Sequence, residues 1–433
     1  MVKNPLKRKI IYTVIVLGML FMLAVLFGLF RTSSIGPNLD KPLTSDEVER
    51  LIPRGRELAI AGDCFGCHSL PEGPLGAGGL GVGTPFGIVY STNITPDKQF
   101  GIGNYSRADF HRALKDGIGK ERGNLYPAMP FVFTHMTTSE DLDALYAYIM
   151  TLPAMPVANK ENTGVFVLPV RPFMNFWTLL NFPQRNPPNN PHRSPEWNRG
   201  AYIIEGLAHC GACHSPRNIM MGVEFSRSLQ GGEYDDLAIP DITAEALSKH
   251  GYDMTSLSQF LQTGISPQGS SFGDMNTVTH FSTNQMSSEI VKDVATYLLT
   301  DQDGQLLEAQ ASPQPLPEAD NTQAYNIMEK GRLAYMSTCA GCHGVEGLGV
   351  PNGIPALKGN AILAMDNPQT FINVVLQGIP TTTFPNGQRM YAMPSFADDL
   401  DAQEIADLIT WARANWGGQS VPVTEEQIEK LKK

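Results

Sequence analysis

All six cysteines of the chain belong to one short motif, Cys-x-x-Cys-His, which occurs three times. Two thiols at this spacing can add across the two vinyl groups of a heme, and the histidine that follows can bind the iron as its proximal ligand. Three complete copies predict three covalently bound heme c groups. The motif residues are Cys64, Cys67 and His68, then Cys210, Cys213 and His214, and finally Cys339, Cys342 and His343.

Two other kinds of site also use paired cysteines. A thioredoxin-like redox site needs a βαβ context, and the surrounding sequence shows none. A zinc site needs four ligands. Three pairs cannot be matched evenly, they lie more than a hundred residues apart, and zinc would not require a histidine after each pair. We therefore favour heme, which leaves no cysteine for a disulfide framework.

Methionine is the usual second axial ligand in electron-carrying cytochromes c. We predict Met129, Met275 and Met393 in this role, because each lies in a loop shortly before the last helix of its repeat. The spacing from the motif histidine is 61 residues for the first two and 50 for the third. Met286 is the rival in the second repeat. The six remaining histidines do not recur at equivalent positions in all three repeats, and we interpret them as structural or surface residues.

A heme-ligating histidine usually donates its other ring N–H to a backbone carbonyl or a carboxylate. Pro355, twelve residues after His343, is the predicted carbonyl donor in the third repeat. Pro85 is predicted for the first repeat on a weaker pattern.

The same pair of helices is expected around each motif. Gly55, Gly200 and Gly331 lie in a helix-like stretch eight to ten residues ahead of the first cysteine. A second helix is predicted over 139–151, 287–300 and 401–416, each with acids in its first turn and an aromatic near its end. The aromatics are Tyr148, Tyr297 and Trp411. We expect the glycine to let the first helix approach the last. Ser194 and Pro195 are typical of a helix start.

The repeats predict an all-α fold of three class-I-like cytochrome c domains in tandem behind one N-terminal transmembrane helix. The predicted boundaries are a cytoplasmic basic tail over 1–9, a transmembrane helix over 10–30, domain 1 over 45–155, a linker over 156–194, domain 2 over 195–305, a linker over 306–320, domain 3 over 321–418 and a C-terminal tail over 419–433. The tail contains a small charged helix that we expect to be solvated.

Charge and hydropathy indicate the compartment and the partners. The 433-residue chain has a formal charge of -11, which argues against a nucleic-acid partner. Residues 10–30 carry no charge and follow four basic residues, so they predict a single-pass anchor in the inner membrane with the heme domains on the periplasmic side. The alternative is a cleaved signal peptide, although the run is long and is followed by a poor cleavage site.

With these motifs, the sequence resembles the triheme cytochrome c subunits of bacterial membrane-bound dehydrogenases that oxidise alcohols, aldehydes, gluconate, fructose or sorbitol. The resemblance covers about residues 45–425. Its most specific stretches are Thr84-Pro85-Phe86-Gly87, Ser91-Thr92-Asn93-Ile94-Thr95-Pro96-Asp97, Gly101-Ile102-Gly103, Leu125-Tyr126-Pro127-Ala128-Met129-Pro130, Arg199-Gly200-Ala201-Tyr202, Cys213-His214-Ser215-Pro216-Arg217-Asn218, Met393-Pro394-Ser395-Phe396 and Trp416-Gly417. Two departures are the apparent membrane anchor and the absence of a proline after Met275.

The resemblance implies a subunit that takes electrons from a catalytic dehydrogenase partner (a quinoprotein, flavoprotein or molybdoprotein) and passes them to ubiquinone at the lipid bilayer. No nucleotide-binding glycine motif, P-loop or nucleophile motif is present, so we expect no substrate-oxidising site in this chain. The alternatives are a multiheme enzyme, such as a peroxidase or a sulfur-compound oxidase, which needs one labile iron ligand, or a heme subunit of a terminal oxidase. The linker from Val157 to Pro195, rich in aromatics, packs over the domains or docks a partner or the membrane.

Overall fold

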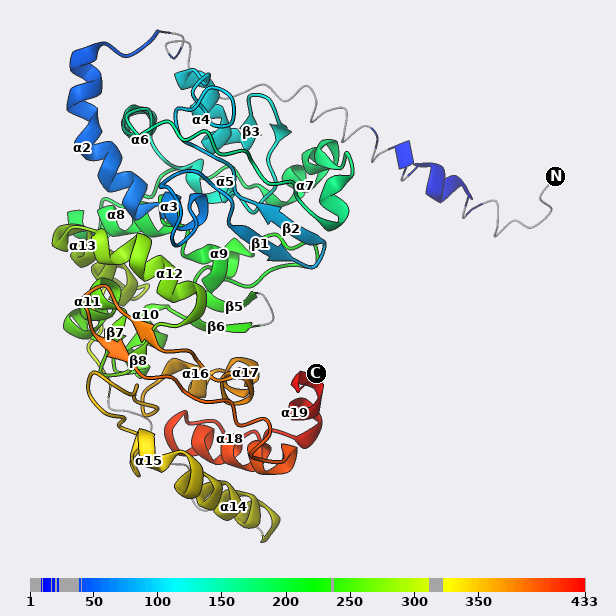
Figure 1. Cartoon of the computed structure of the whole chain (residues 1–433), viewed down its shortest axis with the longest axis vertical. Helices are drawn as coiled ribbons and strands as arrows, with labels where there is room; N and C mark the ends of the chain where they lie inside the picture. The colour runs from blue at the N-terminus through cyan, green and yellow to red at the C-terminus, as the bar shows by residue number, and fades with distance from the viewer. Residues whose placement is uncertain are drawn as a thin grey trace. The chain divides into compact units, whose positions relative to one another are not determined.

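The computed structural model describes residues 9, 11–16, 18, 19, 22, 39, 41–234, 237–310 and 322–432. The chain divides into two compact units (Figure 1). The first unit comprises Met1–Ala59 with Cys67–Pro187, and the second comprises Ile60–Gly66 with Pro188–Lys433.

Helices dominate the first unit, together with short strands. Its helices are α2 (Ser45–Ala61), α4 (Arg107–Asp116), α5 (Phe131–Thr134), α6 (Ser139–Ile149) and α7 (Met174–Asn181), with the 3₁₀ turns η1 (Gly164–Val167) and η2 (Arg171–Phe173). Helix α3 (Cys64–His68) carries the first motif, of which Cys64 belongs to the second unit and Cys67 and His68 belong to the first. Two antiparallel ribbons pair β1 (Gly81–Thr84) with β2 (Gly87–Tyr90) and β3 (Ile118–Gly119) with β4 (Gly123–Asn124).

The second unit contains the other two motifs. Its helical elements are α8 (Pro195–Tyr202), η3 (Ile203–Leu207), α9 (Gly211–His214), η4 (Phe225–Arg227), α10 (Ala244–Lys249), α11 (Met254–Thr263), α12 (Gly273–Phe281), η5 (Thr283–Gln285), α13 (Ser288–Leu299), α14 (Thr322–Thr338), α15 (Ala340–His343), α16 (Ala361–Ala364), α17 (Gln369–Gln377), α18 (Ala402–Trp416) and α19 (Glu425–Leu431). Its antiparallel ribbons pair β5 (Gln230–Tyr234) with β6 (Leu237–Asp241), β7 (Ile265–Ser266) with β8 (Gly269–Ser270), and β9 (Thr382–Thr383) with β10 (Arg389–Met390). The all-α prediction is thus confirmed in its coarse, mostly helical form, while two-stranded ribbons are added to it.

Local sequence explains where the repeated helices begin. The side chain of Ser194 accepts a hydrogen bond from the backbone N–H of Trp197, and Pro195 opens α8 as predicted. Thr138, Ser287 and Asp401 cap α6, α13 and α18 in the same way. Each cap satisfies a backbone donor that a helix start leaves without a partner.

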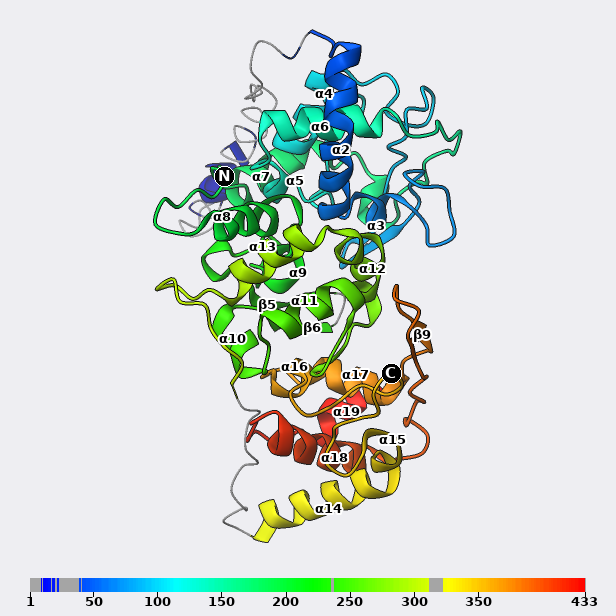
Figure 2. The same cartoon turned by 90° about the vertical axis from the view of Figure 1, so that its left-hand side faces the viewer.

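The glycine ahead of each motif lets two helices touch. A Cβ placed on Gly55 would lie 1.9 Å from the carbonyl oxygen of Ala144 in α6. The equivalent atom on Gly200 would lie 2.1 Å from the Asp293 oxygen in α13, and on Gly331 2.1 Å from the Asp407 oxygen in α18. The next atoms met are the Cβ atoms of Tyr148, Tyr297 and Trp411. These distances confirm the predicted role of all three glycines. In Figure 2, α8 lies beside α13 and α14 lies beside α18.

The core of the third repeat is built on the contact between α14 and α18. Tyr335 packs against Trp411 with ring centroids 4.9 Å apart and against Trp416 at 5.0 Å. Ile428 of α19 is fully buried in the same hydrophobic cluster. The charged residues of the tail helix are exposed, as expected, whereas its single isoleucine joins the core.

The predicted anchor over residues 10–30, and with it the placement of the protein as a single-pass protein in the inner membrane, is contradicted by the structure. In the part of the chain that the structure describes, no helix has both the length and the apolar character required to cross a bilayer. Residues 10, 17, 20, 21 and 23–30 lie outside the described residues.

Candidate heme sites

The first motif histidine is oriented by a backbone carbonyl. His68 ends α3, and its Nδ1 lies 2.6 Å from the carbonyl oxygen of Thr92, just after strand β2. A carbonyl can only accept, so Nδ1 carries the proton. The prediction of Pro85 in this role is wrong, because Pro85 lies in the turn between β1 and β2, several residues ahead of the strand end that approaches the histidine.

The second motif histidine is held by the β5–β6 ribbon. His214 donates from Nδ1 to the carbonyl oxygen of Pro240 in β6 at 2.8 Å. The ribbon lies directly on the motif: a Cβ on Gly232 of β5 would lie 2.5 Å from the Ser215 oxygen and 2.7 Å from the Cys213 oxygen. Glycine is therefore required for the strand to come this close.

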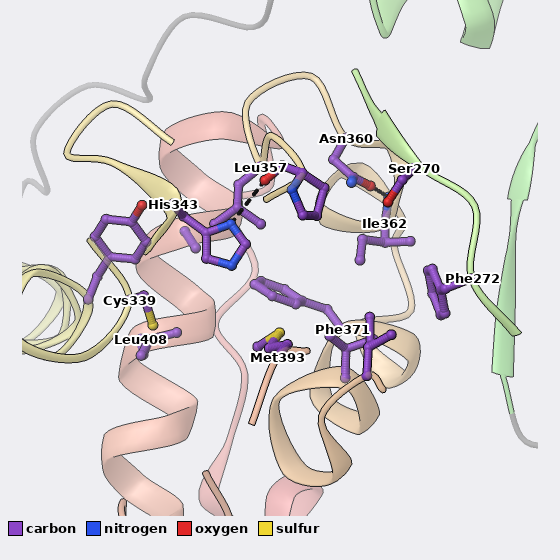
Figure 3. Close-up of a pocket in the computed structure, with 15 residues that line it drawn as sticks. Ser270, Phe272, Cys339, His343, Leu357, Asn360, Ile362, Phe371, Met393 and Leu408 are labelled. Carbon is purple, nitrogen blue, oxygen red and sulfur yellow. Dashed lines mark hydrogen bonds between the residues drawn. The ribbon is translucent and has the colours of Figure 1, made fainter. Parts of the chain in front are cut away.

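The third motif histidine confirms the sequence prediction. His343 donates from Nδ1 to the carbonyl oxygen of Pro355 at 3.0 Å. In Figure 3 this hydrogen bond is a dashed line beside the labelled His343.

The three histidines share one electronic state. Burial lowers the pKa of His68, His214 and His343, while the hydrogen bond to the carbonyl opposes this shift in each case. With the proton on Nδ1, the lone pair on Nε2 is free to bind a metal ion. Each motif thus presents a neutral imidazole in the tautomer that a heme iron needs.

None of the six motif cysteines, all of which the structure describes, forms a disulfide bond. Burial raises the pKa of the Cys210 thiol to about 12 and that of the Cys339 thiol to about 11, and it also raises the pKa of Cys213. A raised pKa is typical of a buried, unreactive thiol rather than of a redox-active dithiol. Addition of the thiols to heme vinyl groups is the chemistry that the motif still allows.

A cavity beside the third motif tests whether a heme fits. Its empty volume is about 640 Å³, including the part that is open to solvent. His343, Cys339 and Met393 all line it, and most of the remaining wall is apolar, including Phe371 and Leu408 (Figure 3). An imidazole, a thiol and a thioether around one apolar cavity are the donor set of a heme c with histidine and methionine ligands.

The backbone holds Met393 at that cavity. Its N–H and carbonyl both pair with Ile379 at 2.9 Å. A Cβ on Gly378, whose φ is +71°, would lie 2.4 Å from the Met393 oxygen, so this approach also requires a glycine. Met393 is therefore the residue for which the structure provides both a cavity and a fixed backbone.

The other two methionines differ in their local structure. Met129 lies in a turn, with its N–H bonded to the Tyr126 carbonyl at 2.9 Å, directly before α5. Met275 instead lies in the first turn of α12, where its carbonyl accepts from the Thr279 hydroxyl at 3.0 Å. The rival Met286 is buried in the hydrophobic cluster of the second repeat. The assignment of Met129 and Met275 as ligands stays a prediction.

The carbonyls of Thr92 and Pro240 are the functional groups that sequence reasoning missed. Thr92 belongs to one of the stretches that carry the family resemblance, so a signal for it existed. Pro240 is a proline like Pro355, and the carbonyls of these two prolines accept from His214 and His343 respectively. The predicted structural role of the other histidines is seen at two positions: His111 bonds Asp143 at 2.9 Å, and His135 accepts from the Arg185 N–H at 3.0 Å.

Comparisons with known proteins agree with this chemistry. The family model described as cytochrome c matches residues 328–416. The chain is 33% identical over 413 residues to the cytochrome c subunit of the quinone alcohol dehydrogenase of Gluconobacter oxydans, covering 89% of this chain and 83% of that protein. It is 33% identical over 412 residues to the gluconate 2-dehydrogenase cytochrome c subunit of Pantoea cypripedii, with coverage of 90% and 92%.

A third relative is longer. The chain is 37% identical over 369 residues to a subunit of the nicotinate dehydrogenase of Pseudomonas putida, and the match covers 84% of this chain but only 30% of that protein. Two relatives above 30% identity are covered over most of their length, and the orientation of three motif histidines fits covalent heme. The chain belongs to the family of electron-transferring cytochrome c subunits of bacterial dehydrogenases.

Proposed function

We propose that the chain carries three covalent heme c groups in three cytochrome c domains, over 45–155, 195–305 and 321–418. Each heme is attached through the two cysteines of one motif. The iron ligands are His68 with Met129, His214 with Met275, and His343 with Met393. The observation that carries this proposal is the repeated geometry of the motif histidines, which donate Nδ1 to a backbone carbonyl at 2.6, 2.8 and 3.0 Å.

The residues around each iron hold the ligands and exclude water. Burial favours the neutral form of each imidazole, and the carbonyls of Thr92, Pro240 and Pro355 fix its tautomer and orientation. The apolar wall of the third cavity lowers the local polarity, which is one of the levers by which a protein sets a heme potential. A heme with histidine and methionine ligands carries one electron at a time and has no open position for a substrate. The arrangement therefore suits electron transfer rather than a peroxidase or oxidase reaction.

The partner that supplies the electrons is a separate catalytic dehydrogenase subunit. Named relatives belong to dehydrogenases of alcohol and gluconate, so an alcohol, aldehyde, sugar or sugar acid is the substrate class we propose for the partner. A quinoprotein, flavoprotein or molybdoprotein can carry out such an oxidation. Ubiquinone is the proposed acceptor, consistent with the word quinone in the name of the alcohol dehydrogenase relative.

The number of hemes is tested by mass spectrometry of the denatured full chain, produced with the cytochrome c maturation machinery. We expect a mass increase equal to three hemes and heme-dependent peroxidase staining after denaturing electrophoresis. The Cys339→Ser, Cys342→Ser double variant should lose one heme mass and keep two. An unmodified mass for the wild-type chain would refute the proposal.

The electron route is tested with the partner that copurifies with the chain. Addition of that dehydrogenase's substrate should reduce the hemes, as followed by their visible absorption, and a soluble ubiquinone analogue should reoxidise them. Carbon monoxide added to the reduced protein distinguishes electron transfer from the alternative function. Strong binding at one heme would favour a multiheme enzyme, because carbon monoxide can bind only where an iron ligand is labile.

A further inference from the structure

The cavity at His343 has a wall that comes from another part of the chain. Most of its lining residues lie between 335 and 412, within the proposed third domain. Ser270 and Phe272 are the exceptions, because they belong to the proposed second domain. In Figure 3 the labelled Phe272 comes from the strand-like segment on the side of the cavity opposite His343. The third site is therefore incomplete without this segment.

The backbone determines where Phe272 stands. Its φ and ψ are -145° and 169°, so it is extended, and it immediately precedes α12. Gly273 follows with φ +56° and turns the chain into the helix. An L-residue at this position would be strained whatever its neighbours are. This abrupt turn places Phe272 at the cavity and Met275, the proposed ligand in the second site, three residues further on.

Packing around Phe272 keeps its segment against the third domain. A Cβ on Gly264, whose φ is +77°, would lie 2.7 Å from a ring carbon of Phe384. Phe384 is itself 2% exposed and forms a buried cluster with Ile265 and Met390. A Cβ on Gly269 would lie 2.7 Å from the side-chain nitrogen of Asn360. Contacts this close fix the distance between the segment and the cavity.

A second connection joins the same two sites through strand β6. The carbonyl of Pro240 in β6 accepts from His214, the proximal histidine of the second site. Two residues earlier, the carbonyl of Ala238 accepts from the buried hydroxyl of Thr370 at 2.7 Å. Thr370 lies in α17, the helix that also places Phe371 and Val374 in the cavity wall. Strand β6 therefore accepts one hydrogen bond from the proximal histidine of the second site and one from the helix that lines the third site.

We propose that Phe272 is the side chain through which the second and third heme sites meet, so that electrons pass directly between the heme held by His214 and the heme held by His343. The inference rests on the three hemes of the proposed function and adds their order and the positioning residue between them. An aromatic ring fills this gap with apolar volume, excludes water from the third heme and bridges to the ligand loop of the second.

The test compares Phe272→Ala and Phe272→Leu with Phe384→Leu in the full chain. Phe384 packs at the same contact between the domains but does not line the cavity, so its variant serves as the matched control. Potentiometric titration followed by electron paramagnetic resonance gives the potential of each heme. Flash photoreduction followed by visible absorption gives the rate at which electrons redistribute among the hemes.

We expect Phe272→Ala to lower the potential of the third heme, because water reaches it, and to slow redistribution between the second and third hemes several-fold. Phe272→Leu should restore much of both, and Phe384→Leu should change neither to the same extent. Unchanged potentials and rates in Phe272→Ala would overturn the inference, as would equal effects in the Phe384 control. Three heme masses in these samples keep the proposed function intact in either case, whereas fewer than three in the wild type overturn both.

Discussion

The substitution Gly331→Ala tests the close contact between α14 and α18, which recurs at the equivalent glycine of each repeat. The added Cβ would lie 2.1 Å from the carbonyl oxygen of Asp407 and 2.7 Å from the Cβ of Trp411, whereas ordinary contact begins at 3.4 Å. Neither atom can rotate away, because one is backbone and the other is fixed to it. Helices α14 and α18 must therefore move apart by about 1.3 Å at this point, which is the difference between 3.4 and 2.1 Å.

The cost follows from two opposing effects. Overpacking of this kind destabilises a core by roughly 1–3 kcal/mol. Alanine offsets about 1 kcal/mol of this cost, since it has a higher helix propensity than glycine. Separation of the helices also disturbs the packing of Trp411 on Tyr335. The two effects leave a net loss of about 0–2 kcal/mol, and the disturbed packing of Trp411 favours the upper half of this range. Each 1 kcal/mol should lower the melting temperature of a domain of this size by roughly 4–8 °C.

Thermal unfolding followed by circular dichroism and by heme absorption measures this loss. Gly341→Ala is the matched control, because Gly341 is a helical glycine of the same domain with no atom within 4 Å of the position of its Cβ. The control should melt like the wild type. A Gly331→Ala protein as stable as both would refute the reasoning that close helix approach requires this glycine.

The remaining predictions concern one ligand and one buried acid. Met129→Ala should lower the potential of the first heme and leave it covalently attached, because methionine ligation raises the potential; potentiometry and mass spectrometry check this, and three unchanged potentials would contradict it. Burial raises the pKa of Asp63 from 3.8 to about 8, so the folded state holds this proton more tightly than the unfolded chain does. Stability should therefore fall as pH rises from 3.8 to about 8, by on the order of 5 kcal/mol at most. Asp63→Asn keeps an acceptor for the Gly66 N–H and should flatten the decline of the melting temperature with pH. The control variant Asp303→Asn, at an exposed position, should not flatten it. Parallel pH profiles for Asp63→Asn and the wild type would rule out the buried charge as the cause.

Chemistry that depends on neighbours in the sequence could be predicted well. The Cys-x-x-Cys-His motif places two thiols and an imidazole within about one helical turn, so residue type and spacing are enough to identify it. The helix start at Ser194 followed from a capping pattern and those near 287 and 401 from acids in the first turn, and the structure confirms all three. The glycines at 55, 200 and 331 could be predicted because the same pattern occurs three times.

Groups that act across long separations could not be predicted in the same way. The carbonyl of Pro355 is 12 residues from His343 and was found from the sequence, while those of Thr92 and Pro240 are 24 and 26 residues from their histidines. The path of a ribbon over that length depends on how it packs, and no local signal reports it. The burial of Asp63, with one carboxylate oxygen left without a partner, is likewise a property of its surroundings.

The amino-acid sequence alone predicted that this protein binds heme covalently and which histidines bind the iron, because those predictions follow from residue types and spacings within a few residues. Only the tertiary structure decided which distant segments meet at the cavity of His343. Phe272 shows the reason: it lines the cavity of His343 where Gly273 turns the chain into α12 and Phe384 packs against Gly264. Such a contact between segments some seventy residues apart depends on the packing of whole domains.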